Sequence, residues 1–351
     1  LDFAIKEHAD NAGKIIFDNG TFDGAAALFD FKEINVGKDN ATHLIVGAET
    51  LGDNAETINV AGNSDVTFSK STMGSQTLNV DVEGTGKTFI YRDIILAEGK
   101  KIGTALEIGN DETKGTGSLQ ANANQLIISD GLAATSGTIK NDGVLTLTGG
   151  ELIRSVSGDG KVVAADALTI GENVKVAQTV YGSITNASDN TVDLKLKDGS
   201  EVQQVVGGYN ADGDASNNTV NVNIFDDATG TGKITGIDDD DVWNDAITGG
   251  YALNGKSSGN IINIIDGNIN GDVTGGFGEE GASENKVSVT GGTINKDLVG
   301  GEGSGNIGKN SVTIDGGKIN SKEIYGGSGN NATFSENFVK ITGGEINNSS
   351  E

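Results

Sequence analysis

The chain has 351 residues, with 55 glycines, no proline and no cysteine, and only 5% of its residues are aromatic. The absence of cysteine excludes disulfides, thiolate metal sites and cysteine nucleophiles. The formal net charge of −26 argues against binding to nucleic acid or to an anionic membrane surface, because no basic stripe is present to neutralise phosphates.

The first 150 residues show a loose rhythm of short segments. Residues 1–30 are the least repetitive and are expected to form an irregular or capping N-terminal segment. From residue 31 onward, apolar residues alternate with polar ones over short runs such as 43–46 and 57–60, and glycine, asparagine or aspartate separates the runs. An alternation with a period of two predicts short strands that bury one face.

A stricter repeat occupies the second half of the chain. Each copy begins with an asparagine followed by alternating apolar residues, and it continues into a glycine turn and one isoleucine, as at 316–319. The copies start at Asn260, Asn285, Asn310 and Asn337, in steps of 25, 25 and 27 residues. A fixed period in this range is typical of a solenoid, whose single repeat cannot pair its own backbone and is stable only when stacked on its neighbours.

The repeat therefore predicts an all-β fold, a parallel β-helix (solenoid) with about one turn per 25-residue repeat. It is expected to run continuously over residues 31–351, with strict repeats from about 180 to 346. Equivalent apolar residues of successive copies should stack in buried columns. The two columns expected from the strict copies are Val287 with Val312 and Val339, and Val289 with Ile314 and Ile341.

One turn carries an insertion. The step from Asn218 to Asn260 is 42 residues, about 17 more than one period, and most of the excess falls in a loop expected at 229–246. Long loops in compact folds are commonly functional, and Trp is enriched at interface hot spots. Two interpretations stay open: Trp243 packs back onto the solenoid and pins the loop, which we favour, or the segment is a partner-contact loop. The residues concerned are Asp238, Asp239, Asp240, Asp241 and Trp243, the only tryptophan.

These repeats resemble the passenger domains of bacterial type V autotransporters, in particular the large autotransporter adhesins. The resemblance rests on the run at 139–150 and on the N-x-V-x-I-x-G-G-x-I units, and it covers roughly residues 138–346. It implies a right-handed β-helix, secretion through an outer-membrane β-barrel, and an extracellular or cell-surface location in a Gram-negative bacterium, with a role in virulence. That family's signal peptide and C-terminal barrel are missing from the sequence, as expected for an excised passenger, so membrane attachment would be only through the missing barrel.

The function expected from this resemblance is adhesion. A host surface molecule, a polysaccharide or another copy of the chain would bind through many weak contacts along the polar faces and loops of a rigid β-helix. Two alternatives stay open, namely a non-binding stalk that displays another domain and a carbohydrate-active β-helix enzyme. The enzyme is the less favoured, because no pair of ionisable groups at a fixed separation can be nominated.

No catalytic, cofactor or metal residue is predicted. His8 and His43 have no nucleophile motif beside them, so both are expected to be ordinary strand or loop residues. The G-K-S-S-G run at 255–259 precedes a strand rather than a helix, unlike a nucleophile elbow. The G-T-G-K-T run at 84–88 is also followed by a strand, unlike a phosphate loop. The segment 210–214 lacks the glycine and glutamate of a calcium loop, and weak, non-specific calcium binding is left open.

Overall fold

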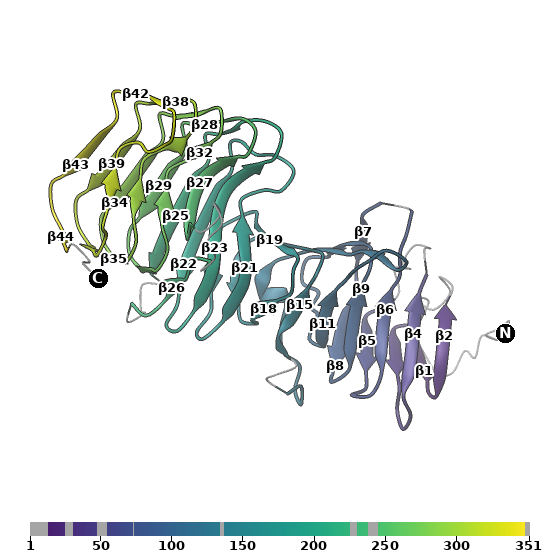
Figure 1. Cartoon of the computed structure of the whole chain (residues 1–351). Coiled ribbons are helices and arrows are strands. Elements are labelled where there is room, and N and C mark those ends of the chain that lie inside the picture. Colours follow the sequence, from purple (N-terminus) through teal and green to yellow (C-terminus); the bar gives the residue numbers. More distant parts are fainter. Residues whose placement is uncertain are drawn as a thin grey trace. The chain divides into compact units, whose positions relative to one another are not determined.

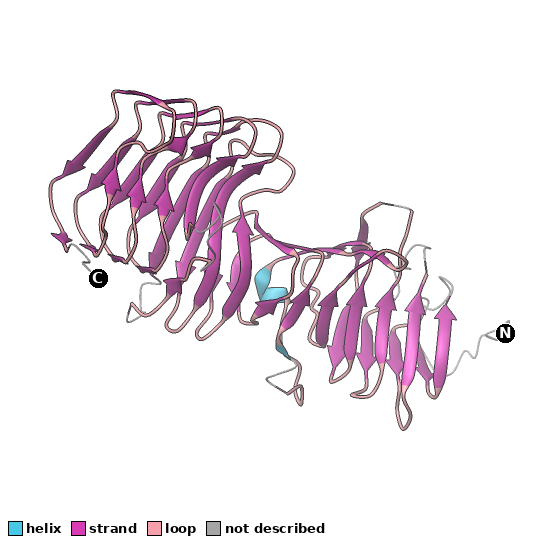
Figure 2. Ribbon diagram, in the orientation of Figure 1, coloured by secondary structure: helices cyan, strands magenta, loops and turns pink. Residues whose placement is uncertain are grey.

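The computed structural model describes residues 13–24, 31–47, 55–72, 74–133, 137–224, 230–237 and 245–347. Within these ranges the regular elements are almost all β-strands, with the short 3-10 helix η2 (Ala123–Gln125) among them (Figure 2). The chain divides into two compact units, which consist of residues 1–121 with 125–145 and of residues 122–124 with 146–351. β16 (Val144–Leu147) contains the point of division.

The first unit is built from rows of parallel strands (Figure 1). One row is β1 (Lys14–Phe17), β3 (Glu33–Val36), β5 (Thr57–Val60) and β8 (Asp81–Gly84). The second is β2 (Gly20–Gly24), β4 (Thr42–Val46), β6 (Asp65–Phe68), β9 (Lys87–Ile90), β11 (Ala105–Ile108) and β15 (Ile139–Asn141). The third is β7 (Gln76–Leu78), β10 (Asp93–Leu96) and β14 (Ser118–Ala121). An antiparallel hairpin joins β12 (Asn110–Asp111) to β13 (Gly115–Thr116).

Of the segment 1–30, predicted to be irregular or capping, the structure describes residues 13–24, which form regular strands; the capping role stays a prediction. β1 and β2 are regular strands that pair in parallel with β3 and β4. The physical reason is the alternation itself, because Ile15 and Phe17 lie in register with Ile34 and Val36 and continue the same apolar columns.

The second unit also consists of parallel rows. One is β17 (Gly150–Leu152), β20 (Leu168–Ile170), β22 (Thr191–Leu196), β25 (Thr219–Ile224), β29 (Ile261–Ile264), β34 (Lys286–Val289), β39 (Ser311–Ile314) and β43 (Phe338–Ile341). Another is β24 (Ala215–Ser216), β28 (Lys256–Ser258), β33 (Gly281–Ser283), β38 (Asn306–Gly308) and β42 (Thr333–Ser335).

The remaining strands of this unit form a third side. They are β18 (Val156–Ser157), β19 (Lys161–Ala164), β21 (Lys175–Tyr181), β23 (Glu201–Asn210), β26 (Lys233–Ile234), β27 (Ile247–Ala252), β30 (Asn268–Ile269), β31 (Val273–Thr274), β32 (Phe277–Gly278), β35 (Thr293–Ile294), β36 (Leu298–Val299), β37 (Glu302–Gly303), β40 (Lys318–Ile319), β41 (Ile324–Tyr325) and β44 (Glu345–Ile346).

Each unit is thus a parallel β-solenoid, as the repeat predicts. The strict copies stack with a register of one repeat, so that Val287 pairs with Val312 and Val289 pairs with Ile314. These side chains are at most 1% exposed. The last members of the two columns, Val339 and Ile341, keep the register but are 39% and 51% exposed. The prediction of burial is wrong for these two, because no further turn among the described residues stacks on β43.

A ladder of buried asparagines explains why each copy begins with that residue. The backbone N–H of Asn260 donates to Oδ1 of Asn285 at 3.1 Å, and the Asn260 Nδ2 donates to the same oxygen at 2.8 Å. The two bonds recur from Asn285 to Asn310 at 3.0 Å each. The same pairing links Asn190 to Asn218, Asn218 to Asn260 and Asn310 to Asn337. The amide side chain therefore satisfies backbone groups at a buried corner of every turn.

The residue before each ladder asparagine adopts the left-handed backbone conformation. This position is Gly259 in one copy, but it is Glu284 in the next, with φ of 60°, and Lys309 in the one after, with φ of 58°. A non-glycine residue costs about 1–2 kcal/mol in this conformation. The cost recurs in every copy except the one with Gly259, so the hydrogen bonds of the ladder must outweigh it in the folded protein.

The insertion at 229–246 is only partly a loop. Lys233–Ile234 form β26, which pairs in parallel with Glu201–Val202 of β23 and with β30. The prediction of a loop over the whole span is wrong at this strand. The reason is that Ile234, next to the outward-facing Lys233, points into the core and is 0% exposed.

Candidate functional site

The predicted contact loop cannot be compared with the structure. Asp238, Asp239, Asp240, Asp241 and Trp243 all lie outside the described residues. Their role as a partner contact stays a prediction.

Three of the weak motifs lie among the described residues. Ser257 lies within β28, is 0% exposed and donates its hydroxyl hydrogen to the carbonyl of Gly250 at 2.8 Å, so it is no exposed nucleophile. The G-T-G-K-T run leads into β9, a strand rather than a helix. His43 lies on β4 and pairs with the carboxylate of Asp65 at 2.5 Å, whereas His8 lies outside the described residues.

Two pockets that share Lys70 and Tyr91 lie on the outer face of the first unit. Because Thr88 and Ile90 of β9 point into the core and are 0% exposed, the alternation turns Phe89 and Tyr91 outward. Their rings are stacked, with centroids 6.5 Å apart and planes 10° from parallel. Phe89 lies beside Thr67 of β6, which in turn lies beside Ile45 of β4. The larger pocket has a volume of 520 Å³.

The position of the Tyr91 ring depends on a glycine. A Cβ atom on Gly109 would lie 2.1 Å from Cε1 of Tyr91, far closer than two carbon atoms can approach. Gly109 follows β11 and leads into the hairpin of β12 and β13, which brings the Nζ of Lys114 to 5.4 Å from the centroid of the Tyr91 ring. A cation over an aromatic face is attracted by the ring quadrupole.

The hairpin tip is rigidly held. The carboxylate of Asp111 accepts hydrogen bonds from the Thr113 hydroxyl at 2.7 Å and from the backbone N–H groups of Thr113 and Lys114 at 2.8 Å each. These bonds, with the Thr113 hydroxyl contributing most, lower the pKa of Asp111 to about 2. Thr116 donates to the Asn110 side chain at 2.8 Å. These bonds therefore hold the backbone of the hairpin from which the Lys114 side chain extends to the pocket.

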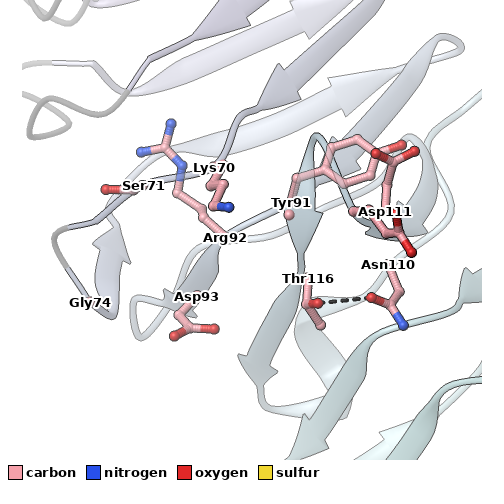
Figure 3. Close-up of a pocket in the computed structure, with 11 residues that line it drawn as sticks. Lys70, Ser71, Gly74, Tyr91, Arg92, Asp93, Asn110, Asp111 and Thr116 are labelled. Carbon is pink, nitrogen blue, oxygen red and sulfur yellow. Dashed lines mark hydrogen bonds between the residues drawn. The ribbon is translucent and has the colours of Figure 1, made fainter.

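The smaller pocket, of 430 Å³, lies on the other side of Tyr91. Figure 3 shows Lys70, Arg92 and Asp93 on one side of it and Asn110, Asp111 and Thr116 on the other. Arg92 is only 3% exposed. It donates to the side-chain oxygen of Gln76 at 2.5 Å and to the carbonyls of Val46 and Gly47, and burial lowers its pKa. Arg92 thus ties β4, β7 and the chain after β9 together behind the pockets.

A second cluster, which consists of aromatic residues, lies in the other unit. Tyr209, Tyr251 and Phe277 lie side by side on β23, β27 and β32. The rings of Tyr251 and Phe277 are stacked at 4.7 Å. Tyr251 is 3% exposed and Phe277 is 9% exposed, so these rings are packed against one another rather than open to a ligand.

Three carboxyl groups accompany these aromatic rings. Burial, together with the negative charges of Glu302 and Asp272, raises the pKa of Asp245 to about 7, although the 3.0 Å hydrogen bond from the Thr248 hydroxyl acts in the opposite direction. Burial also raises the pKa of Asp272 and of Glu302. Asp245 belongs to the solenoid framework, because its carbonyl accepts a hydrogen bond from the Gln204 side chain at 2.9 Å.

This cluster predicts a stability that falls with rising pH. The unfolded chain should bind a proton at Asp245 with the ordinary pKa of 3.8, whereas the folded protein binds it with a pKa of about 7. The stabilising contribution is therefore complete below about pH 4 and is lost as the pH rises to about 7. The free energy of unfolding of Asp245→Asn is compared with that of wild type at each pH. We expect this difference to be about 1–3 kcal/mol more favourable to the variant at pH 8 than at pH 4.

Urea unfolding at the two pH values measures this effect. Asp266→Asn is the matched control, because Asp266 is exposed and its carboxylate accepts a hydrogen bond from the backbone N–H of its neighbour Gly267. A pH dependence that is the same in Asp245→Asn and in wild type would contradict the prediction.

The residues around Tyr91 were missed by sequence reasoning. A signal does exist, because Phe89 and Tyr91 occupy the outward positions of a strand where polar residues are usual, and the segment 110–116 interrupts the strand rhythm just afterwards. Within the described ranges, no group of three or more histidine, aspartate or glutamate side chains is arranged to hold a metal ion. In the same ranges no helix is long and apolar enough to cross a membrane.

Comparison of the chain with protein-family models, with curated proteins and with solved structures returned no match.

Proposed function

We propose that this chain is part of an adhesin: an extracellular or cell-surface passenger of the autotransporter kind, which attaches to a host surface molecule, a polysaccharide or another copy of itself. The observation that carries the proposal is the outer face of the first unit. Two open pockets, of 430 and 520 Å³, lie on this face, and between them they present an apolar floor and a rim of hydrogen-bonding side chains. Apolar surface with a few placed polar groups is the usual composition of a ligand site.

The repeated polar side chains of the second unit support the same proposal. Exposed asparagines recur once per turn, and Asn320 donates to Asn295, which donates to Asn270, each at 2.8 Å. Parallel strands place such groups about 4.8 Å apart. A long ligand could contact many of them at once, and weak contacts that act together produce a high avidity.

One observation supports the alternative that the chain is an enzyme. Asp245, Asp272 and Glu302 form the ionisable cluster that the sequence could not nominate, and a general acid works best when its pKa is close to the working pH. The aromatic rings beside this cluster are buried, however, which leaves little surface for a sugar to stack upon. We therefore propose binding rather than catalysis, and a stalk without binding activity is the remaining alternative.

An adhesion test with a loop variant separates these possibilities. We expect beads coated with the full chain to aggregate or to retain glycans on an array. Replacing residues 238–244 with a Gly-Ser linker of equal length should reduce that association several-fold if the acidic loop and Trp243 are contacts. The replacement spares β26 and Asp245, which are bonded into the solenoid, so the melting temperature should stay within a few degrees.

Three results would count against the proposal or its parts. No association by the wild-type chain with any bead or glycan would favour the stalk. Unchanged association in the variant would remove the loop as a contact. Turnover of a polysaccharide that is lost in Asp245→Asn would favour the enzyme.

A further inference from the structure

The floor of the 520 Å³ pocket in the first unit is apolar. Ile45 and Phe89, both partly exposed, point outward from β4 and β9 and form the accessible floor, whereas Tyr91, only 8% exposed, borders it just after β9. The aliphatic parts of threonine side chains on the neighbouring strands fill the space between them. The flat C–H face of a sugar ring matches such a floor, because it buries apolar surface against aromatic carbon atoms without removing hydroxyl groups from water.

The rim of this pocket is cationic, in a chain whose net charge is −26. Lys70 and Lys114 approach the pocket from different segments, and both are exposed. Among the described residues neither ammonium group has a carboxylate within 4.0 Å, whereas ten other pairs in those residues do. The one nearby carboxylate that lines the pocket, that of Asp65, is already paired with His43.

Two lysines without an ion pair within 4.0 Å, above an apolar floor, favour a ligand that carries a negative charge on an apolar face. An ammonium group forms its stronger hydrogen bonds with an ionised acceptor, and a carboxylate supplies one. Nucleic acid is a poor match, because the outer face offers two lysines here rather than a continuous basic stripe. A sugar ring with a carboxylate substituent satisfies both the floor and the rim.

We propose that this pocket binds a uronic acid unit of an acidic polysaccharide, with the ring over Phe89 and Ile45 and the carboxylate held by Lys70 and Lys114. The proposal rests on the adhesive function proposed above and names the class of ligand for one of its sites. The hairpin of β12 and β13 contributes to the specificity, since the Asp111 hydrogen bonds hold the backbone of Lys114 at a place from which its Nζ lies 5.4 Å from the Tyr91 ring centroid.

The test compares acidic oligosaccharides with their own uncharged forms. The full chain is titrated calorimetrically at low salt with oligogalacturonate, oligomannuronate and hyaluronan oligosaccharides, each as the free acid and as the methyl ester. The ester keeps the ring and removes the charge. We expect the free acid of at least one of these sugars to bind at least about tenfold more tightly than its ester, and to lose affinity as salt is added.

Lysine variants assign the preference to this pocket. The double variant Lys70→Gln with Lys114→Gln should bind acid and ester equally. Lys87→Gln is the matched control, because Lys87 is an exposed lysine on β9 that does not line the pocket, and it should keep the preference. Circular dichroism should show all variants folded, since each replaced side chain is exposed.

Several outcomes would overturn the inference. It fails if none of the three acids binds, if acid and ester bind equally, or if Lys87→Gln loses as much affinity as the double variant. Bead aggregation by the wild type and by the double variant distinguishes this failure from failure of the broader proposal. If beads aggregate although no acidic sugar binds, adhesion stands and only the uronic acid site is wrong.

Discussion

Replacing Asn285 with alanine is expected to lower the free energy of unfolding by about 3–5 kcal/mol. Asn285 is 0% exposed. Its Nδ2 donates to the Ser257 carbonyl and to the Asn310 side chain at 3.0 Å each, and its Oδ1 accepts from the N–H and the Nδ2 of Asn260. Alanine would leave buried donors and an acceptor without partners, and each such group carries a desolvation cost of about 1–3 kcal/mol.

The second asparagine ladder provides the control. Asn295 lies in the same repeat, is exposed, and bonds to Asn270 and Asn320 in a similar way. Because water can replace those bonds, Asn295→Ala should cost less than about 1 kcal/mol. Urea unfolding followed by circular dichroism measures both variants. Equal losses would show that burial of the inner ladder contributes nothing beyond the hydrogen bonds themselves.

Ile314→Asp is the other substitution with a large expected effect. Ile314 is 0% exposed and lies in register between Val289 and Ile341. An aspartate there would place an unpaired carboxylate in a core that is one side chain deep. We expect a loss of several kcal/mol, measured as a lower urea midpoint or as failure of the strands around β39 to gain protection from hydrogen exchange.

Lys318→Ala is the matched substitution in the following turn. The side chain of Lys318 is exposed. Its backbone N–H donates an inter-strand hydrogen bond to the Gly292 carbonyl, which the substitution would leave in place. The variant should change the free energy of unfolding by less than about 0.5 kcal/mol. Comparable effects from Ile314→Asp and Lys318→Ala would mean that the buried columns have been assigned to the wrong face.

The 25-residue period was sufficient to predict parallel stacking and the alignment of Val287 with Val312. A solenoid turn interacts mainly with the turn before and the turn after, so its hydrophobic pattern is local in sequence and can be read directly. The same pattern identified the asparagine at the start of each copy but did not predict its structural role. The ladder depends on the Asn285 amide reaching Asn260 and Asn310 across two turns, which is a relation between strands.

The pocket around Tyr91 was decided by tertiary structure alone. Lys70 and Lys114 are separated by 44 positions in the chain, and Ile45 and Phe89 by as many, yet they line one pocket. Successive turns bring such positions together, and the exact neighbours depend on the length of each connection, which varies in the first unit. The hairpin that carries Lys114 is an interruption of the rhythm, so no repeat could have predicted where it lies.

The sequence by itself thus determined the kind of fold and the buried face of each regular strand, because both follow from a period of two within strands and of about 25 between them. Only the tertiary structure decided which outward side chains meet, which carboxyl groups lie half-buried beside Tyr251, and that β26 returns to the solenoid inside the insertion. Outward positions are not constrained by packing, so their periodicity carries no information about which of them lie close together in space.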